Sequence, residues 1–505
     1  MPTSDNKSLI SAATIIGGTA LGILGFLVLK YPDCRVFEDV QKGVPQVKGY
    51  PLIGTLFQQL GEFKRFYDAQ HEQLENLDTK TMINSSILVS LTVTTIDPRN
   101  INHILKDNYR NYIKDPYLKR CSKEFFGDGI FVNEGSAWRI HRKTASRVFG
   151  SKDLQKCFDQ VFAKNLKVIT HEVLDQIAID GSVVDFQQLI LKFTMDSFIK
   201  IGFGKDLQIL TQKGVVPLVE SFDAGMDHIT ASYMNPFTPI VDTLHPLLYP
   251  HTKTIHQHHN TLHQFANDVI SERRRDIQNG KTFNDLLSQF INTTSEQGEF
   301  FTNDELQHLI ISTISAGRET TSASIVWTVY RLIMNPTIET KFLEEIDAYL
   351  PSNDYQEDLD PIKLYYESMR LHPPIPVNQR VAVNDDLWPD GTEIRKGNVI
   401  SWNNYAQGRS SKIWGSDCLE FKPERWILED GTLYKEKKGQ WPMFNIGPRS
   451  CLGEKLAIME GLTTLITLIR RYKFSLYNPN QKVEYSVGVT LSVKDGLKLL
   501  VTKRH

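Results

Sequence analysis

The chain has 505 residues, of which 41% are hydrophobic and 23% charged, and its formal net charge at pH 7 is −2. The length gives room for several domains or for one large enzyme, and the composition is that of an ordinary globular chain. This composition excludes a disordered, collagen-like, coiled-coil or polytopic membrane protein. The small net charge gives no overall field that would recruit nucleic acid. The five scattered cysteines favour a reducing compartment over a disulfide framework.

An apolar run from Leu9 to Leu29 predicts a membrane anchor near the N-terminus. Its 21 uncharged residues would form about 30 Å of helix, enough to cross a bilayer core. A cleaved signal peptide, the main alternative, would have a shorter apolar core behind a positive start. Here the positive charges follow the run, at Lys30 and Arg35, so the positive-inside rule places the rest of the chain in the cytosol. The chain then divides into a tail (1–8), a transmembrane anchor (9–29), a Pro- and Gly-rich tether (30–54) and one large body (55–505).

Within this body the sequence predicts mainly helices and a small β portion. Dense β-branched residues from Ile87 to Ile96, ended by Asp97-Pro98, predict a strand. Most of residues 100–340 has the spacing of long amphipathic helices, one of them over Asp304–Met334. Residues 375–440 turn irregular, with short strands and a turn at Pro389-Asp390-Gly391.

The segment from Phe444 to Gly453, FNIGPRSCLG, is the most informative in the chain. It places Cys451 at the end of a loop shaped by Gly and Pro, directly before the helix-forming run Glu454 to Glu460. A helix N-terminus presents unpaired N–H groups and the positive end of a dipole, which stabilise a thiolate. A lone intracellular cysteine is more often a buried structural residue. The loop by itself does not decide between these two interpretations.

This segment resembles the haem-binding signature of the cytochrome P450 family, F-x-x-G-x-R-x-C-x-G, at every fixed position. The resemblance implies the cytochrome P450 fold, with residues 55–505 as one haem-enclosing catalytic domain, and haem b with Cys451 as the axial thiolate ligand of its iron. Phe444 would shield the sulfur and Gly447 would allow the tight turn. Arg449 would reach a haem propionate, and Gly453 would let the following helix approach the porphyrin.

A second motif lies in the long predicted helix, where Ala316 to Thr321 reads AGRETT. A glycine beside an acid and two threonines predicts a locally distorted helix with a small pocket, because a Thr hydroxyl bonded to a carbonyl loosens the backbone ladder. An N-cap that opens a second helix is the alternative. The motif resembles the oxygen-activation motif of the same family. That resemblance implies that Thr320 hydrogen-bonds dioxygen and that Glu319 relays protons.

Glu367 and Arg370 lie three residues apart, on one predicted helical face. An exposed pair of this kind is a common accident that contributes about 0–1 kcal/mol. With Arg425 in the downstream segment FKPERW, however, the pair resembles the E-x-x-R and P-E-R-W elements of the family. The resemblance implies one buried ion cluster of structural importance.

Three further residues look like propionate-binding residues of the family. Trp138 and Arg142 match its W-x-x-x-R pair, although an aromatic ring stacked with a surface cation is the alternative. Arg380 follows the segment PPIP and matches a further arginine that contacts a propionate. A guanidinium suits this task because its fork fits a carboxylate.

Two charged or titratable clusters have weaker interpretations. The first would form a basic proximal face in the family fold and dock an acidic flavoprotein, with solvated surface as the alternative; it comprises Arg139, Arg142, Lys143, Lys435, Lys437 and Lys438. The second has no Cys or acid at a zinc-like spacing, so a solvated helix or loop near the substrate entrance is favoured over a metal site. It comprises His245, His251, His256, His258, His259 and His263.

The resemblance implies a haem-thiolate monooxygenase that inserts one oxygen atom of O₂ into a C–H bond of a lipophilic substrate. NADPH electrons would arrive through a separate flavoprotein, NADPH–cytochrome P450 reductase, with cytochrome b5 as a further candidate partner. The predicted anchor places the protein in the endoplasmic reticulum membrane, with the catalytic body in the cytosol.

The substrate is inferred from scaffold segments. Tyr405–Arg409 and Cys418–Ile427 look like the plant and fungal fatty-acid and alkane hydroxylase branch, so we expect terminal or near-terminal hydroxylation of a fatty acid. The same fold could act on sterols, terpenoids, aromatics or foreign compounds. It could also run a rearrangement or peroxide reaction, or serve as a non-catalytic haem sensor or carrier.

Overall fold

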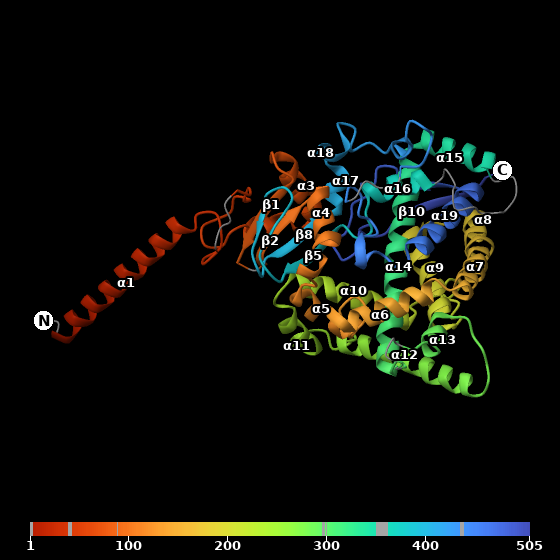
Figure 1. Cartoon of the computed structure of the whole chain (residues 1–505), viewed down its shortest axis with the longest axis horizontal. Helices are drawn as coiled ribbons and strands as arrows, with labels where there is room; N and C mark the ends of the chain where they lie inside the picture. Colours follow the sequence, from red (N-terminus) through yellow and green to blue (C-terminus); the bar gives the residue numbers. More distant parts are fainter. Residues whose placement is uncertain are drawn as a thin grey trace.

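The computed structural model describes residues 4–38, 43–87, 89–294, 298, 300–349, 362–434 and 439–504, and the side chains of these except 4–15, 89, 90 and 349. One long helix, α1 (Ser4–Lys30), projects away from the body (Figure 1). The predicted anchor coincides with α1, but the tail and the first third of the anchor lie outside the described side chains. Among the residues that the structure describes, no helix is both long enough and apolar enough to cross a membrane. The anchor therefore stays a prediction.

The second half of the predicted tether packs against the body instead of spanning free space. The Val47 N–H donates to the Ile83 carbonyl at 2.9 Å, and the Ile83 N–H donates to the Pro45 carbonyl at 2.9 Å. Gly54 forms a bridge to Ser86. Residues 81–86 form the edge of a sheet, and edge backbone groups need partners. The tether supplies them.

The body is mostly helical, as predicted. Figure 1 shows these helices around a central one. Their bounds are α2 (Leu56–Gly61), α3 (Phe66–Asn76), α4 (Pro98–Asn102), α5 (Pro116–Phe126), α6 (Gly135–Phe149), α7 (Lys152–Lys167), α8 (Asp175–Asp180), α9 (Phe186–Phe203), α10 (Pro217–Met234), α11 (Thr238–Leu248), α12 (Ile255–Gln278), α13 (Leu286–Ile291), α14 (Asn303–Met334), α15 (Pro336–Tyr349), α16 (Ile362–Leu371), α17 (Asn404–Arg409), α18 (Ser411–Trp414) and α19 (Glu454–Arg471).

The central helix, α14, confirms the helix predicted over residues 304–334. It begins with a capping box, in which the Thr302 hydroxyl accepts from the Glu305 N–H and the Glu305 carboxylate accepts from the Thr302 N–H. The helices α9, α12, α16 and α19 all contact it, and its buried residues lie on every side. A helix buried all round crosses the core of a domain.

The small β portion consists of three sheets. The largest has the strand order β1-β2-β8-β5-β3, with β2 and β8 parallel and the other pairs antiparallel. The predicted strand at 87–96 is β2, and the irregular region 375–440 contains β5 to β8, as expected. The bounds are β1 (Thr81–Ser86), β2 (Val89–Thr95), β3 (Tyr112–Ile113), β4 (Val184–Asp185), β5 (Val377–Ala382), β6 (Asp386–Leu387), β7 (Glu393–Ile394), β8 (Val399–Asn403), β9 (Tyr472–Leu476) and β10 (Lys498–Lys503).

Two large apolar clusters form most of the core, and α14 belongs to both. Ile314 packs in the cluster that also holds residues of α7, α9, α10 and α12. Ile325 packs in the cluster that holds residues of α16, α19, β9 and β10. The motif segment 316–321 lies between these two anchor points, so packing on both sides fixes its position.

Candidate functional site

The loop before α19 closes on itself around Cys451. The Cys451 N–H donates to the Phe444 carbonyl at 2.7 Å. Gly447 has a φ of +71°, and a Cβ on it would lie 2.5 Å from the Leu105 carbonyl oxygen, so no larger residue fits there. Phe444 packs against the larger apolar cluster of the core. The predicted tight turn at Gly447 is thus present, and it fixes Cys451 three residues before the first residue of α19.

Two opposing influences act on the pKa of the Cys451 thiol. Solvent can reach the residue, but the protein atoms packed around it desolvate the thiol and raise its pKa. A hydrogen bond from the Gly453 backbone and the nearby Arg142 charge act in the opposite direction and are weaker. The choice between a thiolate and a structural cysteine, which the loop sequence leaves open, stays a prediction. A bound metal ion would deprotonate the sulfur outright.

Neither the backbone conformation nor the neighbouring described residues require a glycine at position 453. Its φ is −95°, which any residue adopts. No described atom outside its chain neighbours lies within 4 Å of the position that a Cβ would take. The space beside Gly453 is free for a group that is not part of the chain.

Arg449 and Trp138 meet beside this loop. The guanidinium of Arg449 lies 4.0 Å from the centre of the Trp138 ring, and it also forms an ion pair with Glu134. Arg142, one turn after Trp138 on α6, reaches the Ser450 hydroxyl at 3.4 Å. The structure thus brings three of the residues predicted to bind propionate to one side of Cys451. Sequence reasoning paired Trp138 with Arg142, but it is Arg449 that stacks on the indole.

Two further buried cations face the same region. Burial, together with the Arg449 charge, lowers the pKa of Arg380 to about 10. Lys114, at the end of β3, has its pKa lowered well below the usual range by burial and by the charges of Arg380 and Arg449. Lys114 was missed by sequence reasoning, because it follows a two-residue strand and belongs to no motif. In the part of the chain that the structure describes, Glu134 is the carboxylate that acts on this group of cations.

The motif segment of α14 is regular helix. Thr320 donates its hydroxyl to the Ala316 carbonyl at 2.6 Å, yet α14 is continuous from Asn303 to Met334. The predicted local distortion is therefore not present, and a second helix beginning at Thr320 is excluded. Gly317 is needed for another reason: a Cβ there would overlap the Phe198 ring of α9. The two helices approach closely at this point, and the backbone hydrogen bonds of α14 continue through it without a break.

Glu319 lies beside Arg318, a buried residue of the same motif to which the sequence analysis assigned no role. Arg318 is fully buried and pairs with Glu319 and with Asp223 of α10, the latter at 2.6 Å. Burial raises the pKa of Glu319, and the Asp223 and Asp227 charges add to this rise, while Arg318 opposes it. A neutral, protonated Glu319 is therefore accessible at higher pH than for an ordinary glutamate.

The residues predicted to form an ion cluster come together in the structure. Arg370 forms two hydrogen bonds to Glu367, at 2.8 and 2.7 Å, and both side chains are fully buried. Arg425 lies 3.5 Å from the same carboxylate, and the Trp426 indole N–H donates to it at 3.0 Å. Arg370 also bonds the Gly408 and Cys418 carbonyls. The cluster ties α16 to the segment that leads toward the cysteine loop.

The histidine-rich stretch is solvated only in part, since His251 and His256 are exposed. His258 and His259 are buried where α12 packs on α10, at 8% and 3% exposure, and His258 lies 3.1 Å from the Ser221 hydroxyl. Burial lowers the pKa of His259 to about 4, so this ring is neutral at pH 7. Over the ranges that the structure describes, no three His, Cys, Asp or Glu side chains are placed to hold a metal ion.

The basic surface predicted for electron transfer is described only in part. Arg139 and Lys143 of α6 are exposed, while Arg142 is half-buried and turned toward the cysteine loop. Lys435, Lys437 and Lys438 lie outside the described residues.

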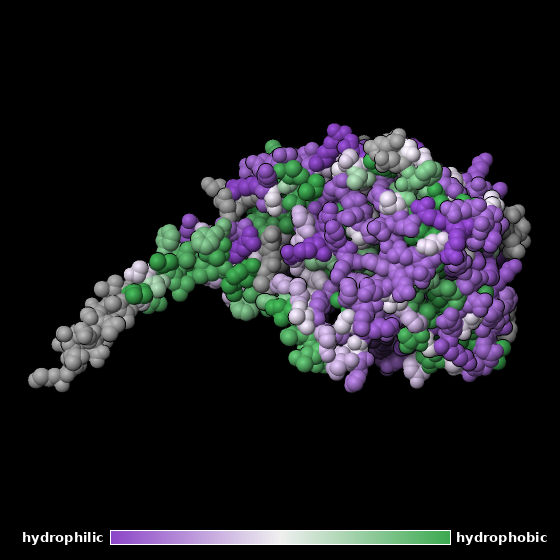
Figure 2. All heavy atoms as spheres, turned by 90° about the horizontal axis from the view of Figure 1, so that it is seen from below, coloured by the Kyte–Doolittle hydropathy of each residue, from purple (hydrophilic) through white to green (hydrophobic). Residues whose placement is uncertain are grey.

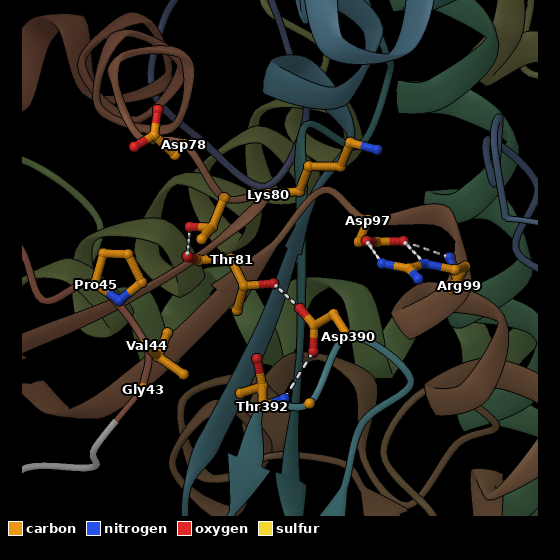
Figure 3. Close-up of a pocket in the computed structure, with 12 residues that line it drawn as sticks. Gly43, Val44, Pro45, Asp78, Lys80, Thr81, Asp97, Arg99, Asp390 and Thr392 are labelled. Atoms are coloured by element: carbon orange, nitrogen blue, oxygen red, sulfur yellow. Dashed lines mark hydrogen bonds and ion pairs between the residues drawn. The ribbon is translucent and has the colours of Figure 1, made fainter.

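A polar pocket of about 320 Å³ lies away from these residues, at the edge of the large sheet (Figure 3). Asp390 accepts there from the Thr81 hydroxyl at 2.7 Å and from the Thr392 N–H at 2.9 Å. Asp97 pairs with Arg99 at 2.8 Å. Asp390 and Asp97 therefore satisfy neighbouring donors, and the pocket is lined by none of the residues that the sequence predicts to bind haem or to relay protons.

A family model described as cytochrome P450 matches residues 44–498. The chain belongs to the cytochrome P450 family. Cytochrome P450 704B1 of Arabidopsis thaliana is 29% identical over 515 residues, which cover 90% of this chain and 94% of that protein. Cytochrome P450 86B1 of Arabidopsis thaliana is 32% identical over 436 residues, covering 81% and 77%. Cytochrome P450 monooxygenase cyp1 of Mycosarcoma maydis is 28% identical over 482 residues, covering 91% and 74%.

Membership in the cytochrome P450 family marks the protein as a monooxygenase and implies a haem-thiolate cofactor. The residues present fit that group. Burial raises the pKa of the Cys451 thiol, and a bound metal ion would favour its ionised form. Gly453 leaves free space beside it. Three basic residues, Lys114, Arg380 and Arg449, interact with the Glu134 carboxylate in the described structure, and Arg142 interacts with Arg449 and Cys451. Such a group of basic side chains fits further negative charges such as the two propionates of haem.

Proposed function

We propose that this cytochrome P450 hydroxylates a fatty acid at or near its chain end. One substrate C–H bond, O₂, two electrons and two protons give the hydroxylated product and one water molecule. The observation that carries the monooxygenase chemistry is that one fold presents Cys451 in the loop before α19 and the Glu319–Thr320 pair on α14, and that these two helices are in contact.

Cys451 would hold the haem iron through its sulfur, and the surrounding residues would hold the rest of the cofactor. Phe444 would shield the sulfur, and Arg449, stacked on Trp138, would bind one propionate in place of Glu134. Arg142 and Arg380, with Lys114, would take the remaining propionate charge. When bound, haem supplies the oxygen activation that thiolate ligation favours.

Glu319 and Thr320 would deliver protons from α14. Because burial raises the pKa of Glu319, its carboxyl can hold a proton and release it within the pocket. The Thr320 hydroxyl donates to the Ala316 carbonyl, which leaves its oxygen as an acceptor for a neighbouring proton donor. Arg318 keeps the Glu319 carboxyl in place.

The fatty-acid substrate rests on likeness. The segments Tyr405–Arg409 and Cys418–Ile427 resemble the plant and fungal fatty-acid and alkane hydroxylase branch, and the relatives named above are from a plant and a fungus. In the structure these segments form α17 and the approach to the ion cluster. They support the assignment to a branch and do not line a described pocket.

The electron donor would be NADPH–cytochrome P450 reductase, with cytochrome b5 as a further candidate. The exposed Arg139 and Lys143 on α6, close to Arg142 and the cysteine loop, form a positive surface that would steer an acidic flavoprotein to that side.

The protein would act at the endoplasmic reticulum membrane, with its body in the cytosol. Hydrophobic side chains gather over the part of α1 next to the body (Figure 2), where Leu21, Phe26 and Leu29 are exposed. At the same end of the body (Figure 1), α11 exposes Leu244 and Leu247, and Phe237, the residue before it, is also exposed. Exposed apolar surface of this extent is typical of membrane or protein contact.

A spectral titration of the purified ferric protein tests the substrate assignment. Long-chain fatty acids, alkanes, sterols and aromatics are each added while the spin state of the haem is followed. Saturable conversion to high spin by fatty acids alone, followed by NADPH-dependent product in the presence of reductase, is the expected result. Conversion only by sterols, terpenoids or aromatics would overturn the substrate. Ligand binding without NADPH consumption would indicate a sensor or carrier.

A further inference from the structure

One buried arginine joins α10 to the proton-delivering residues of α14. The Arg318 side chain is fully buried, and one of its terminal nitrogens lies 2.6 Å from the Asp223 carboxylate on α10. The other terminal nitrogen contacts the Glu319 carboxylate. Two carboxylates from different helices therefore form ion pairs with the same guanidinium.

The same helix face carries a third acid. Asp227, one turn after Asp223, interacts electrostatically with both Asp223 and Arg318, and all of these charges act on Glu319. If every carboxyl were ionised, three negative charges would face one positive charge in a partly desolvated site. Burial and the like charges raise the pKa of Asp227 and of Glu319, so the group readily holds an extra proton.

Contacts on either side fix how α10 sits on this part of α14. The Ser315 hydroxyl, one turn before Glu319, donates to the Met226 sulfur at 3.4 Å. On the opposite side of α14, the Thr194 hydroxyl of α9 donates to the Arg318 carbonyl at 3.2 Å. The Arg318 backbone is thus held by α9, while its side chain reaches to α10.

We propose that Asp223 is a positioning residue that competes with Glu319 for Arg318 and thereby keeps Glu319 able to carry a proton. The position of α10 relative to α14 then controls proton delivery beside Thr320. The inference deepens the proposed function, since it rests on Glu319 as the proton relay. With Asp223 ionised and in place, Arg318 is shared and Glu319 binds a proton more readily. When Asp223 is lost or moves away, Arg318 pairs with Glu319 alone and holds it as a carboxylate.

The experiment compares the protonation of Glu319 in four full-length holoproteins: wild type, Asp223→Asn, Arg318→Met and Glu220→Gln. Glu220 is the matched control, because it is an acid on α10 whose side chain is exposed and pairs with Lys253 at 3.1 Å. The carboxylic C=O stretch of Glu319 is followed by infrared difference spectroscopy over a pH series and assigned by its absence in Glu319→Gln. Arg318→Lys and Asp227→Asn replace any variant that does not fold.

Asp223→Asn is expected to lower the titration midpoint of Glu319 by about one pH unit or more, since a like charge is lost and Arg318 is freed. Arg318→Met should raise it, Asp227→Asn should lower it by a smaller amount, and Glu220→Gln should leave it unchanged. An unchanged midpoint in Asp223→Asn, or a shift equal to that of Glu220→Gln, would overturn the proposal.

A second readout separates this inference from the function on which it rests. The ratio of hydroxylated product to NADPH consumed should fall several-fold in Asp223→Asn, and the fall should be largest at high pH, where Glu319 is most ionised. A shifted infrared midpoint with an unchanged product ratio would overturn the relay role of Glu319 itself. An unshifted midpoint would overturn only the link through Asp223 and would leave the proposed function standing.

Discussion

The guanidinium of Arg449 lies over the indole ring of Trp138, 4.0 Å from its centre. The contact joins α6 to the cysteine loop, two segments more than 300 residues apart in the chain. It helps to hold the arginine of the cysteine loop in place, and the other partner of Arg449 is the Glu134 carboxylate. A cation–π contact of this kind stabilises the folded protein by about 0.5–2 kcal/mol.

Replacing this ring should weaken haem retention. We expect Trp138→Leu to release haem several-fold faster than wild type, because Arg449 loses the surface that orients it toward a propionate. Trp138→Phe, which keeps an aromatic face, should lie in between. The measurement is the rate of haem transfer to excess apomyoglobin. Equal rates in all three proteins would show that the stacking is incidental.

Alanine substitutions at the two glycines of the cysteine loop should have different effects on stability and on haem affinity. Gly447→Ala places a Cβ against the Leu105 carbonyl at a residue with φ +71°, so it should destabilise the loop by about 1–3 kcal/mol with or without haem. Gly453→Ala meets no described atom, so the apoprotein should be as stable as wild type while haem affinity falls. Unfolding of apo and holo forms measures both. A destabilised Gly453→Ala apoprotein would contradict the account.

The Glu367–Arg370 pair should be a large structural contributor. Both side chains are fully buried, so Arg370→Met removes the two shortest charged contacts of the buried carboxylate and leaves it only Arg425 at 3.5 Å as an ion pair. The variant should cost about 3–5 kcal/mol in denaturant unfolding. Lys422→Ala is the control, because its side-chain ion pair with Asp417 is half exposed and is expected to contribute about 0–1 kcal/mol. Similar losses for both variants would show that the cluster is not buried as described.

Glu460 gives a pH-dependent prediction. This α19 residue is 1% exposed, neither carboxyl oxygen has a hydrogen-bond partner among the described residues, and burial raises its pKa well above the usual range. In the folded state Glu460 keeps its proton above pH 4.5, while in the unfolded state it loses it. The folded protein therefore loses stability as pH rises from about 4.5 toward the folded-state pKa, by up to about 1.4 kcal/mol per pH unit.

Glu460→Gln removes this penalty because its side chain stays neutral at every pH. The variant should match wild type near pH 5 and become progressively more stable than wild type toward pH 8. Urea unfolding at a series of pH values measures the difference. Two parallel stability curves would contradict a neutral, buried Glu460.

Sequence reasoning located the groups whose signals are local in the chain. The cysteine loop, the capped helix α14 and the pair Glu367–Arg370 each occupy a short segment, and local backbone rules act within such a segment. The region 375–440 was identified as irregular for the same reason, since its turns carry their own glycine and proline signals.

Partners from distant segments were not predictable. Asp223 reaches Arg318 only because α10 packs on α14, and Lys114 joins the cations near Cys451 only because β3 pairs with β5. His258 and His259 look polar in sequence, but the packing of α12 on α10 buries them. Such contacts depend on the relative placement of elements, which periodicity within one element does not encode.

The central claim is that Cys451 ligates haem iron as a thiolate. The most direct test is the reduced carbon monoxide spectrum of wild type and of Cys451→His, with haem content measured in parallel. The account predicts the thiolate-type spectrum in wild type and its loss in Cys451→His, even where the histidine protein retains haem. A Cys451→His protein that keeps the thiolate-type spectrum would contradict the claim, because another sulfur would then have to be the ligand.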